Sequence, residues 1–355
     1  MSIEKTRKEI DSIDGQIVGL LDKRAAKVKS IAAEKSKEHK GVFDPAREAE
    51  VLRRISGKSR IFPKEGVEAV FSEVLSASRA LQGGMKIAFL GPEASFTHMA
   101  AIKKFGQNAE YLAVDSIPDV FFAVEKGQAA FGVAPIENSS EGAVNHTQDM
   151  FFNSQLNIVG EIYLDIHHHL LSNSRPLEIK KIYSHPQAFA QCRKWINRNH
   201  PKAELVEVSS TTKGAESATL YHSSAAIASL LAAKKYNLKV VSENIEDLSN
   251  NTTRFLVIGK ALQKRTGKDK TSIMFSVRHE AGALFSALES FKKFGVNMTK
   301  IESRPTRMKN WEYVFFVDVQ GFVGDEDVKK ALDGMKKHAG FINILGSYPE
   351  ENNTK

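Results

Sequence analysis

The sequence predicts three units of different fold class: an all-α helical N-terminal module, a two-lobed α/β middle domain and an α+β C-terminal domain. Three observations predict this division. Apolar residues of the 355-residue chain recur with a helical period up to about residue 82, alternate between strand-like and helix-like runs from 85 to 262, and follow a βαββαβ order from 271 to 348. A polar linker, QKRTGKDK, separates the last two units. We expect domains at residues 1–84, 85–262 and 270–350.

The composition is typical of a globular protein and speaks against a membrane-spanning or secreted one. The hydrophobic fraction is 42% and the charged fraction 26%, as in an ordinary globular protein. No apolar run approaches the roughly 20 residues that span a bilayer, and the charged N-terminus lacks the apolar region of a secretory signal. The single cysteine, Cys192, excludes an intrachain disulfide and a cysteine-based zinc site. We therefore expect a cytoplasmic protein without a membrane partner.

The net charge of +8 raises the question of a nucleic-acid partner. Basic residues are interleaved with acidic ones, however, and residues 86–262 carry equal numbers of each. This distribution favours a small anionic ligand and no nucleic acid. A DNA-binding regulator that uses the basic helical module is an alternative, and salt-dependent DNA affinity would distinguish it.

Three helices account for the N-terminal module. Apolar residues from Ile3 to Ile31 lie on one stripe with a period near 3.5, which is typical of a long helix packed along a partner. This helix should end before Gly41. Asp44-Pro45, a capping residue followed by proline, opens a second helix, and a third spans about residues 64–81.

Cations lie on or beside the apolar stripe of the first helix, where a charge is costly unless it is paired. Arg24 and Lys35 are about 16 Å apart along a helix, so both can hold one ligand. Arg7 lies about 25 Å from Arg24 and cannot reach that ligand from the same chain. With acids at the start of the second helix, these cations predict a buried anion site, completed by Arg7 across a homodimer or a higher homo-oligomer.

This module resembles the all-helical chorismate mutases and matches their binding positions one for one. The matching residues are Arg7, Arg24, Lys35, Asp44, Arg47, Glu48, Ser78 and Gln82. The resemblance implies that arginines hold the two carboxylates of chorismate, that Lys35 and Gln82 contact the ether oxygen, and that Glu48 contacts the ring hydroxyl. Rearrangement to prephenate is intramolecular and needs no metal or cofactor, only a compact conformer and stabilised charge on the breaking C–O bond.

Alternating strands and helices in residues 85–262 predict parallel sheets with helices on their faces. The order restarts after residue 171, so we expect two lobes, as in periplasmic binding proteins, with a ligand cleft at the strand ends. In the second lobe we expect helices at 187–199 and 223–236. A strand at 252–260 should return to the first lobe.

Polar residues gather where strands of this domain end or begin. They are Ser95, Thr97, Glu137, Asn138, Ser139, Ser184, His185, Gln191, Thr253, Arg254 and Phe255. Together they resemble the prephenate dehydratase domain over nearly all of residues 86–262, with the Thr-Arg-Phe triplet as that family's signature. Two segments depart from the family: Ala94 opens a turn that usually begins with glycine, and residues 210–215 replace a Ser-Thr-Ser-Ala-Ala segment.

The resemblance implies that this domain removes carboxylate and hydroxide from prephenate to give phenylpyruvate. Hydroxide leaves poorly, so a donor must lie beside it, and the resemblance gives this role to Thr253, as an acid or as an orienting group. Arg254 suits a substrate carboxylate by its charge, and equally a structural ion pair.

Two other features, a triple histidine and the single cysteine, have the chemistry of a metal ligand or a nucleophile. In a strand, only His167 and His169 of the triple histidine could chelate together, and without a carboxylate cluster we expect no metal. Cys192 lies on an apolar helix face, so we expect it to pack and not to act as a nucleophile.

The C-terminal unit has the ferredoxin-like βαββαβ order and resembles the ACT regulatory domain. The resemblance implies an L-phenylalanine site at a subunit interface, where backbone N–H groups at a helix start receive the carboxylate. The residues concerned are Gly282, Ala283, Leu284, Asn297, Glu302, Ser303, Arg304 and Pro305.

These resemblances identify the chain as a member of the bifunctional chorismate mutase–prephenate dehydratases, which serve phenylalanine biosynthesis and are inhibited by its product. Two alternatives stay open. An arogenate dehydratase would prefer arogenate over prephenate. A non-catalytic amino-acid sensor would bind prephenate without turnover, and Thr253→Ala would then change nothing.

Overall fold

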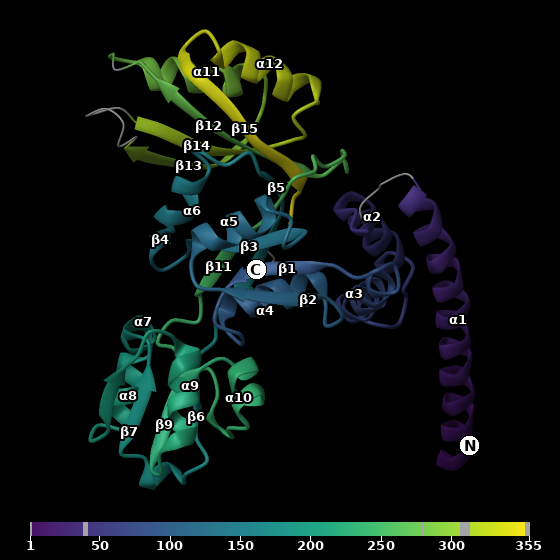
Figure 1. The fold of residues 1–355 in the computed structure, drawn as a ribbon, viewed down its shortest axis with the longest axis vertical. Helices are drawn as coiled ribbons and strands as arrows, with labels where there is room; N and C mark the ends of the chain where they lie inside the picture. Colours follow the sequence, from purple (N-terminus) through teal and green to yellow (C-terminus); the bar gives the residue numbers. More distant parts are fainter. Residues whose placement is uncertain (1, 38–41, 279, 306–312, 352–355) are drawn as a thin grey trace. The chain divides into compact units, whose positions relative to one another are not determined.

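The computed structural model of the protein describes residues 2–37, 42–278, 280–305 and 313–351. The chain forms two compact units. One comprises Met1–Lys86 and Lys104–Glu110, and the other Ile87–Lys103 and Tyr111–Lys355. The predicted fold classes are confirmed, since a helical module, two α/β lobes and a C-terminal sheet with two helices follow in order (Figure 1). The proposed boundary between the last two domains lies within the second unit.

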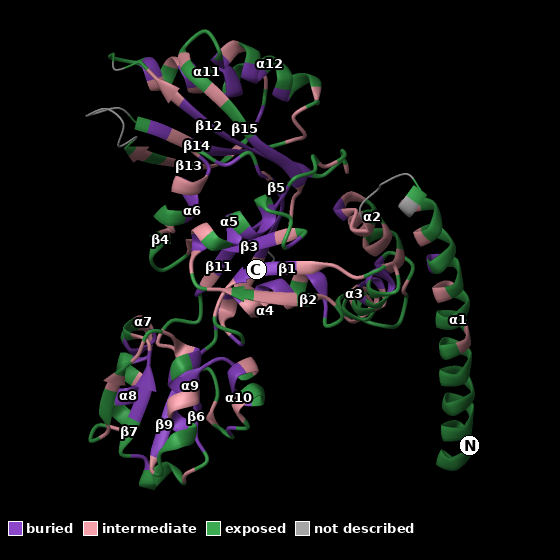
Figure 2. Cartoon of the chain, in the orientation of Figure 1, coloured by how far each residue is buried: buried purple, intermediate pink, exposed green. Residues whose placement is uncertain are grey.

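Three helices build the first unit: α1 (Ile3–Lys37), α2 (Pro45–Ser56) and α3 (Lys64–Ala80). Helix α2 begins as predicted, with Asp44 accepting a hydrogen bond from the backbone of Arg47 and proline at the first position. Most of α1 is exposed, including its apolar stripe (Figure 2). Ile3 and Ile10 are 74% and 51% exposed. A single chain therefore leaves uncovered the surface that the heptad-like pattern predicts to be buried.

The first lobe is built on a mixed sheet with the order β2-β1-β3-β11-β5, and a short β4 pairs with β3. Strand β11 returns to this lobe as predicted, but it runs antiparallel to both neighbours, so only part of the sheet is parallel. Its elements are β1 (Lys86–Leu90), α4 (Phe96–Phe105), β2 (Glu110–Val114), α5 (Ile117–Glu125), β3 (Phe131–Asn138), β4 (Gly142–Ala143), α6 (Asn145–Met150), β5 (Asn157–Asp165) and β11 (Thr252–Gly259).

The second lobe has the strand order β10-β6-β9-β7-β8. Its elements are β6 (His169–Leu171), a 3-10 turn (Pro176–Glu178), β7 (Lys181–Ser184), α7 (Pro186–Gln191), α8 (Arg193–Asn199), β8 (Glu204–Glu207), α9 (Thr211–Leu220), β9 (Ser224–Ala228), α10 (Leu230–Tyr236) and β10 (Val240–Ser242). Figure 1 shows it as a lobe apart from the sheet that contains β3 and β11.

One helix predicted for the second lobe is wrong. Residues 223–236 form the central strand β9 and the short helix α10, and helix α9 precedes them where none was predicted. The β9 segment, Ser-Ala-Ala-Ile-Ala, is buried at every position and lies between β6 and β7. Alanine favours helices, but small residues also fit a strand that is covered on both faces, and here tertiary packing overrides the propensity. The helix predicted at 187–199 is interrupted at Cys192.

The C-terminal sheet has the order β13-β14-β12-β15, which is the ferredoxin-like arrangement. Its elements are β12 (Asp269–Val277), α11 (Ala283–Lys293), β13 (Met298–Pro305), β14 (Tyr313–Gln320), α12 (Glu326–Met335) and β15 (Ala339–Pro349). Phe316 and Tyr348 of this sheet share one buried apolar cluster with Phe121 and Phe151 of the first lobe. The two domains therefore pack through a continuous core. No helix within the described ranges has the length and apolar character to cross a membrane.

Candidate active sites

Several predicted residues of the first unit form hydrogen bonds with one another or with the backbone. Arg24 Nη1 donates a hydrogen bond to Ser78 Oγ and thereby joins α1 to α3. Lys35 Nζ donates to the carbonyl of Val42, 3.1 Å away. Gln82 Nε2 donates to the carbonyl of Ser78 at 3.1 Å, while its Oε1 is buried without a hydrogen-bond partner among the described residues. Gln82 thus retains an unsatisfied polar atom, which is costly unless a ligand or the partner subunit satisfies it.

Arg79 holds Glu48 in this cluster, and sequence reasoning missed it. Its Nη1 lies 2.6 Å from Glu48 Oε1, and its Nη2 donates to the carbonyl of Phe105 at 2.6 Å. Burial raises the pKa of Glu48, and the charge of Arg79 offsets part of that effect. The available signal was the position of Arg79, four residues after the buried Leu75 on the inner face of α3.

Three predicted residues of this module lie apart from the cluster. Asp44 caps α2, and the exposed Arg47 pairs with Glu50 at 2.7 Å. Arg7 lies in the exposed first turns of α1. Because Arg7 and Arg24 belong to one 35-residue helix, Arg7 cannot fold back toward Arg24 of its own chain.

Thr253 lies at the start of β11, directly opposite Asn138, the last residue of β3. Asn138 Nδ2 donates to Thr253 Oγ1 at 2.7 Å and to Asn251 Oδ1 at 2.8 Å. Asn138 Oδ1 in turn accepts from the backbone N–H of Ser140 at 2.9 Å. Because the hydroxyl oxygen of Thr253 accepts from an amide, its own proton is left to donate to another group.

The network extends from the first lobe to the second. Asn251 Nδ2 donates to Gln191 Oε1 at 3.0 Å, at the end of α7. Ser139 Oγ donates to the carbonyl of Asn250 at 2.9 Å beside this network. The structure therefore brings together Asn138, Gln191 and Thr253 of the predicted set and adds Asn251. Asn251 was visible in the sequence only as one polar residue at a strand entry.

Other predicted residues of this domain make local contacts. Ser95 and His185 accept hydrogen bonds from backbone N–H groups at the starts of α4 and α7. Ser184 is fully buried and donates its hydroxyl to the backbone of β9 at 2.7 Å. Thr97 and Phe255 are 7% and 1% exposed. These contacts account for the residue types without a ligand, so their proposed substrate contacts stay predictions.

Two family models match this chain: chorismate mutase type II over residues 6–83 and prephenate dehydratase over residues 87–263. The bifunctional chorismate mutase/prephenate dehydratase of Aquifex aeolicus is 46% identical over 354 residues, which cover 98% of each chain. This chain belongs to that bifunctional family. The Neisseria gonorrhoeae relative is 43% identical over 354 residues, covering 97% of this chain and 96% of the relative.

Solved structures agree with the assignment of the dehydratase domain. A prephenate dehydratase from Arthrobacter aurescens, solved in complex with L-Phe, is 34% identical and aligns with a TM-score of 0.69. The alignment covers 75% of this chain and 90% of that chain. The fold of the described dehydratase and C-terminal domains is thus that of a prephenate dehydratase.

The turn that departs from the dehydratase family at Ala94 keeps a glycine-like backbone. Ala94 has a φ of 65°, in the left-handed region that glycine adopts freely. Its side chain is 1% exposed, and its carbonyl accepts a hydrogen bond from Ser229 Oγ at 3.0 Å. An alanine there costs about 1–2 kcal/mol relative to a right-handed conformation.

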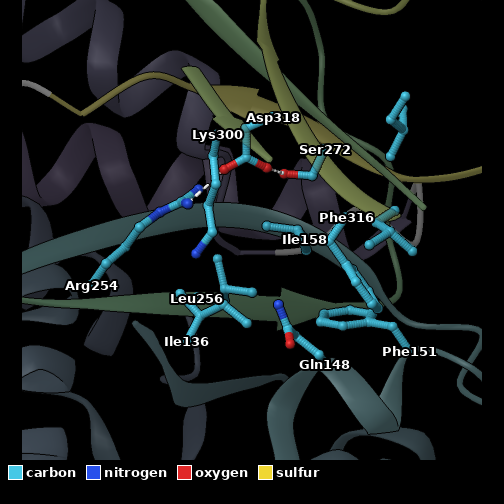
Figure 3. Close-up of a pocket in the computed structure, with 12 residues that line it drawn as sticks. Ile136, Gln148, Phe151, Ile158, Arg254, Leu256, Ser272, Lys300, Phe316 and Asp318 are labelled. Carbon is cyan, nitrogen blue, oxygen red and sulfur yellow. Dashed lines mark hydrogen bonds and ion pairs between the residues drawn. The ribbon is translucent and has the colours of Figure 1, made fainter. Parts of the chain in front are cut away.

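Arg254 faces away from Thr253, because neighbouring residues of a strand point to opposite faces of the sheet. Its guanidinium bonds to Asp318 at 2.5 Å (Figure 3). It also bonds to Glu161 at 2.8 Å and to the hydroxyl of Tyr348 at 3.0 Å. Asp318 and Tyr348 belong to the C-terminal sheet. Of the two interpretations of Arg254, these contacts favour the structural ion pair.

Three further ion pairs join the dehydratase domain to the C-terminal sheet. They are Glu161–Lys270 at 2.8 Å, Glu137–Lys300 at 2.7 Å and Asp149–Arg304 at 2.6 Å. Glu137 was predicted to bind substrate and Arg304 to bind the effector. In this structure both take part in ion pairs between the two domains, and their proposed ligand contacts stay predictions.

The predicted regulatory segments lie at exposed edges of the C-terminal sheet. Gly282 has a φ of 79° and begins α11. Ala283 and Leu284 form its first turn, and Asn297 donates to Gln320 at 3.0 Å. Glu302, Ser303 and Pro305 belong to the edge strand β13. Among the described strands β13 is at the edge of this sheet, and such an edge is available to a ligand or to a second subunit.

Two histidines of the triplet form hydrogen bonds within the protein, and the cysteine is buried. His167 Nδ1 contacts Glu246 at 2.7 Å, and His168 Nε2 contacts Gln191 at 2.8 Å. Cys192 is fully buried, and burial raises the pKa of its thiol well above the ordinary value. A thiol in this environment packs as an apolar group, as the sequence predicts.

Proposed function

We propose that the chain converts chorismate to prephenate in its helical module and prephenate to phenylpyruvate in its dehydratase domain. Membership of the bifunctional family over nearly the whole chain supports both steps. The observation that carries the second step is the hydroxyl of Thr253, whose oxygen accepts from Asn138 and whose proton is free to donate. No metal or cofactor enters either step.

The mutase step needs binding, orientation and charge stabilisation. Arg24 and Arg47 hold carboxylates of chorismate, while Lys35 and Gln82 donate to the ether oxygen as negative charge develops there. Glu48 contacts the ring hydroxyl, and Arg79 holds its carboxylate in place.

A homodimer completes the mutase site in this proposal. The apolar stripe of α1 is exposed in the single chain, and Arg7 lies near its N-terminal end. An antiparallel pairing of two such helices buries both stripes and brings Arg7 of the partner subunit to the site that Arg24 begins. Higher assemblies that contain this pair are equally compatible with it.

In the dehydratase step the bond between the ring and the carboxylate carbon breaks and releases CO₂. The electron pair of that bond moves through the ring toward the carbon that bears the hydroxyl. The C–O bond then breaks, and the leaving oxygen becomes water once it gains a proton. Threonine is a weak acid, so Thr253 acts by directing a hydrogen bond at the leaving oxygen, which stabilises its developing charge.

L-phenylalanine inhibits the dehydratase through the C-terminal domain, which we assign as an ACT domain. The relative from Arthrobacter aurescens was solved with L-Phe bound. Arg254 is bonded to Asp318 of this domain and directly follows Thr253 in β11. A shift of the C-terminal sheet on effector binding therefore reaches Thr253 through one residue of the same strand, provided that L-phenylalanine binds one state better than the other.

One experiment tests the whole proposal. Purified full-length protein is given chorismate, and prephenate and phenylpyruvate are measured over time with and without L-phenylalanine. We expect both products in sequence, and less phenylpyruvate with L-phenylalanine. Binding of prephenate without turnover would favour the amino-acid sensor, and faster turnover of arogenate than of prephenate would favour an arogenate dehydratase.

A further inference from the structure

His168 lies at the far end of the network that begins at Thr253. It belongs to the segment between β5 and β6, is 2% exposed, and contacts Gln191 Oε1 through Nε2 at 2.8 Å. Resting on the proposed dehydratase function, we propose that His168 is a positioning residue for that reaction. It acts through Gln191, Asn251 and Asn138 to hold the hydroxyl of Thr253 with its proton directed at the substrate.

The direction of every hydrogen bond in the network from Thr253 to His168 follows from one backbone N–H group. The N–H of Ser140 can only donate, so the atom of Asn138 that it contacts at 2.9 Å is Oδ1. Asn138 must then present its Nδ2 to Thr253 and to Asn251. The hydroxyl of Thr253 therefore accepts from this amide, which leaves its proton for the substrate.

The same logic continues from Asn251 to His168. Asn251 meets the amide nitrogen of Asn138 with Oδ1, so it presents Nδ2 to Gln191. The atom of Gln191 that accepts from Asn251 must be Oε1. His168 Nε2 contacts the same oxygen and must therefore carry a proton. His168 is therefore the terminal donor, and each amide between it and Thr253 has one permitted orientation.

The surroundings of His168 hold its ring in this role. Burial lowers the pKa of His168, so its imidazole is neutral at pH 7 and donates from a single nitrogen. The ring of Phe96 meets it edge to face with centroids 5.5 Å apart. Glu246 accepts from the backbone N–H of His168 at 2.9 Å, which fixes the segment that carries the ring.

His168 also connects the two lobes of the dehydratase domain. Gln191 lies at the end of α7 in the second lobe, while Thr253 and Asn138 lie on strands of the first. Without the donor at His168, Gln191 keeps one restraint fewer and can turn its amide, which removes the acceptor that fixes Asn251. Asn138 keeps the orientation that Ser140 imposes, but its Nδ2 loses a fixed partner in Asn251 and holds the hydroxyl of Thr253 less firmly. The hydroxyl of Thr253 would then point at the substrate for only part of the time.

The test compares a variant that lacks the donor with one that retains it. His168→Leu should lower kcat for prephenate about fivefold to tenfold, the worth of one buried hydrogen bond, with KM within about twofold. His168→Gln, whose amide can donate at a similar reach, should keep most of the activity. His167→Gln is the matched control, since its imidazole contacts Glu246 and not the network, and it should leave kcat unchanged.

A double variant separates positioning from general damage. Asn251→Leu interrupts the hydrogen-bond network between Gln191 and Asn138. Adding His168→Leu to that variant should therefore lower kcat little further. Denaturant titration of the same preparations reports whether the dehydratase domain is folded, and mutase activity reports the same for the helical module. If His168→Leu fails to fold, His168→Phe replaces it, because it keeps the ring contact with Phe96 without a donor.

Each outcome bears on a different claim. Unchanged kcat in the donor-free variants, or equal losses in His168→Gln and His168→Leu, would overturn the role of His168. Absence of prephenate turnover by the unaltered protein would instead contradict the proposed function itself.

Discussion

The mutase residues and the dehydratase residues of this chain differ in how much of a site one chain supplies. In the dehydratase domain, Asn138, Asn251 and Thr253 are joined by direct hydrogen bonds within a single chain. In the helical module, Arg7 lies on an exposed part of α1, out of reach of Arg24. In our proposal the dehydratase site is made by the folding of one chain, whereas the mutase site requires two chains.

The proposed pairing of two chains would draw on the exposed stripe of α1. Ile3, Ile10 and Ile17 are 74%, 51% and 49% exposed in the single chain. Full burial of one isoleucine side chain contributes about 1.5–3 kcal/mol, so covering several of them on both helices would offset the cost of association. In our proposal, the pairing that buries the stripe also brings Arg7 to the partner's site.

The largest effect we predict is loss of mutase activity in Lys35→Ala. Removing a donor to the breaking C–O bond should lower chorismate turnover by about 100-fold to 1,000-fold, while prephenate turnover stays unchanged. Lys37→Ala, an exposed lysine in the same last turn, is the matched control and should keep both activities. Equal loss of both activities in Lys35→Ala would point to unfolding and would contradict the claim that Lys35 serves the mutase site alone.

The next effect is confined to the dehydratase. Thr253→Ala should lower prephenate turnover about 100-fold, because the leaving oxygen loses its donor, while chorismate turnover is retained. Thr253→Ser should recover much of the rate. Thr252→Ala, which removes the neighbouring hydroxyl bonded to Asp165, is the control. Unimpaired dehydration in Thr253→Ala would leave the sensor alternative standing.

Asp318→Asn should destabilise the dehydratase and C-terminal domains and weaken inhibition by L-phenylalanine. Arg254 and Lys270 are balanced by Glu161 and Asp318, so removing one buried charge costs about 3 kcal/mol of unfolding free energy. Denaturant titration measures that loss. Asp333→Asn, which breaks an exposed pair with Lys336, is the control and should leave the denaturation midpoint essentially unchanged.

The contribution of the Asp318 carboxylate to the free energy of unfolding should decrease as the pH is lowered. Burial alone would raise the pKa of this carboxyl, but the charge of Arg254 and the hydrogen bond from Ser272 hold it below its usual value. A lowered pKa in the folded state means that the contribution is present at neutral pH and is lost in acid. The stability difference between Asp318→Asn and the unaltered protein should therefore shrink as the pH falls below about 4. A difference that does not change with pH would contradict the ionised pair.

The smallest effect concerns Ala94. Glycine removes the cost of the left-handed backbone but gains freedom in the unfolded chain, so Ala94→Gly should stabilise the protein by at most about 1 kcal/mol. A small rise in the denaturation midpoint with unchanged activities would agree. A clear loss of stability would show that the methyl group packs better than its backbone conformation suggests.

Periodicity predicted the fold well because each unit keeps one repeat over many residues. It misassigned residues 223–236, because an alanine-rich strand that is buried on both faces has the local character of a helix. Chain spacing found Arg24, Lys35 and Glu48, since they belong to neighbouring helices. Helix periodicity could place Arg79 on the inner face of α3, and the strand entry marked Asn251 as polar, but neither pattern identifies a partner that is distant in the sequence. For the same reason the partner of Arg254, 64 residues away, was not foreseen.

Mixing Arg7→Ala protein with Arg24→Ala protein tests most directly the claim that the mutase site is shared while the dehydratase site is not. Each variant alone should lack mutase activity and keep dehydratase activity. After subunit exchange, half of the dimers are hybrids with one intact site of two, so mutase activity should return to about a quarter of the unaltered level. No recovery, in a mixture shown to exchange subunits, would contradict a site shared between chains.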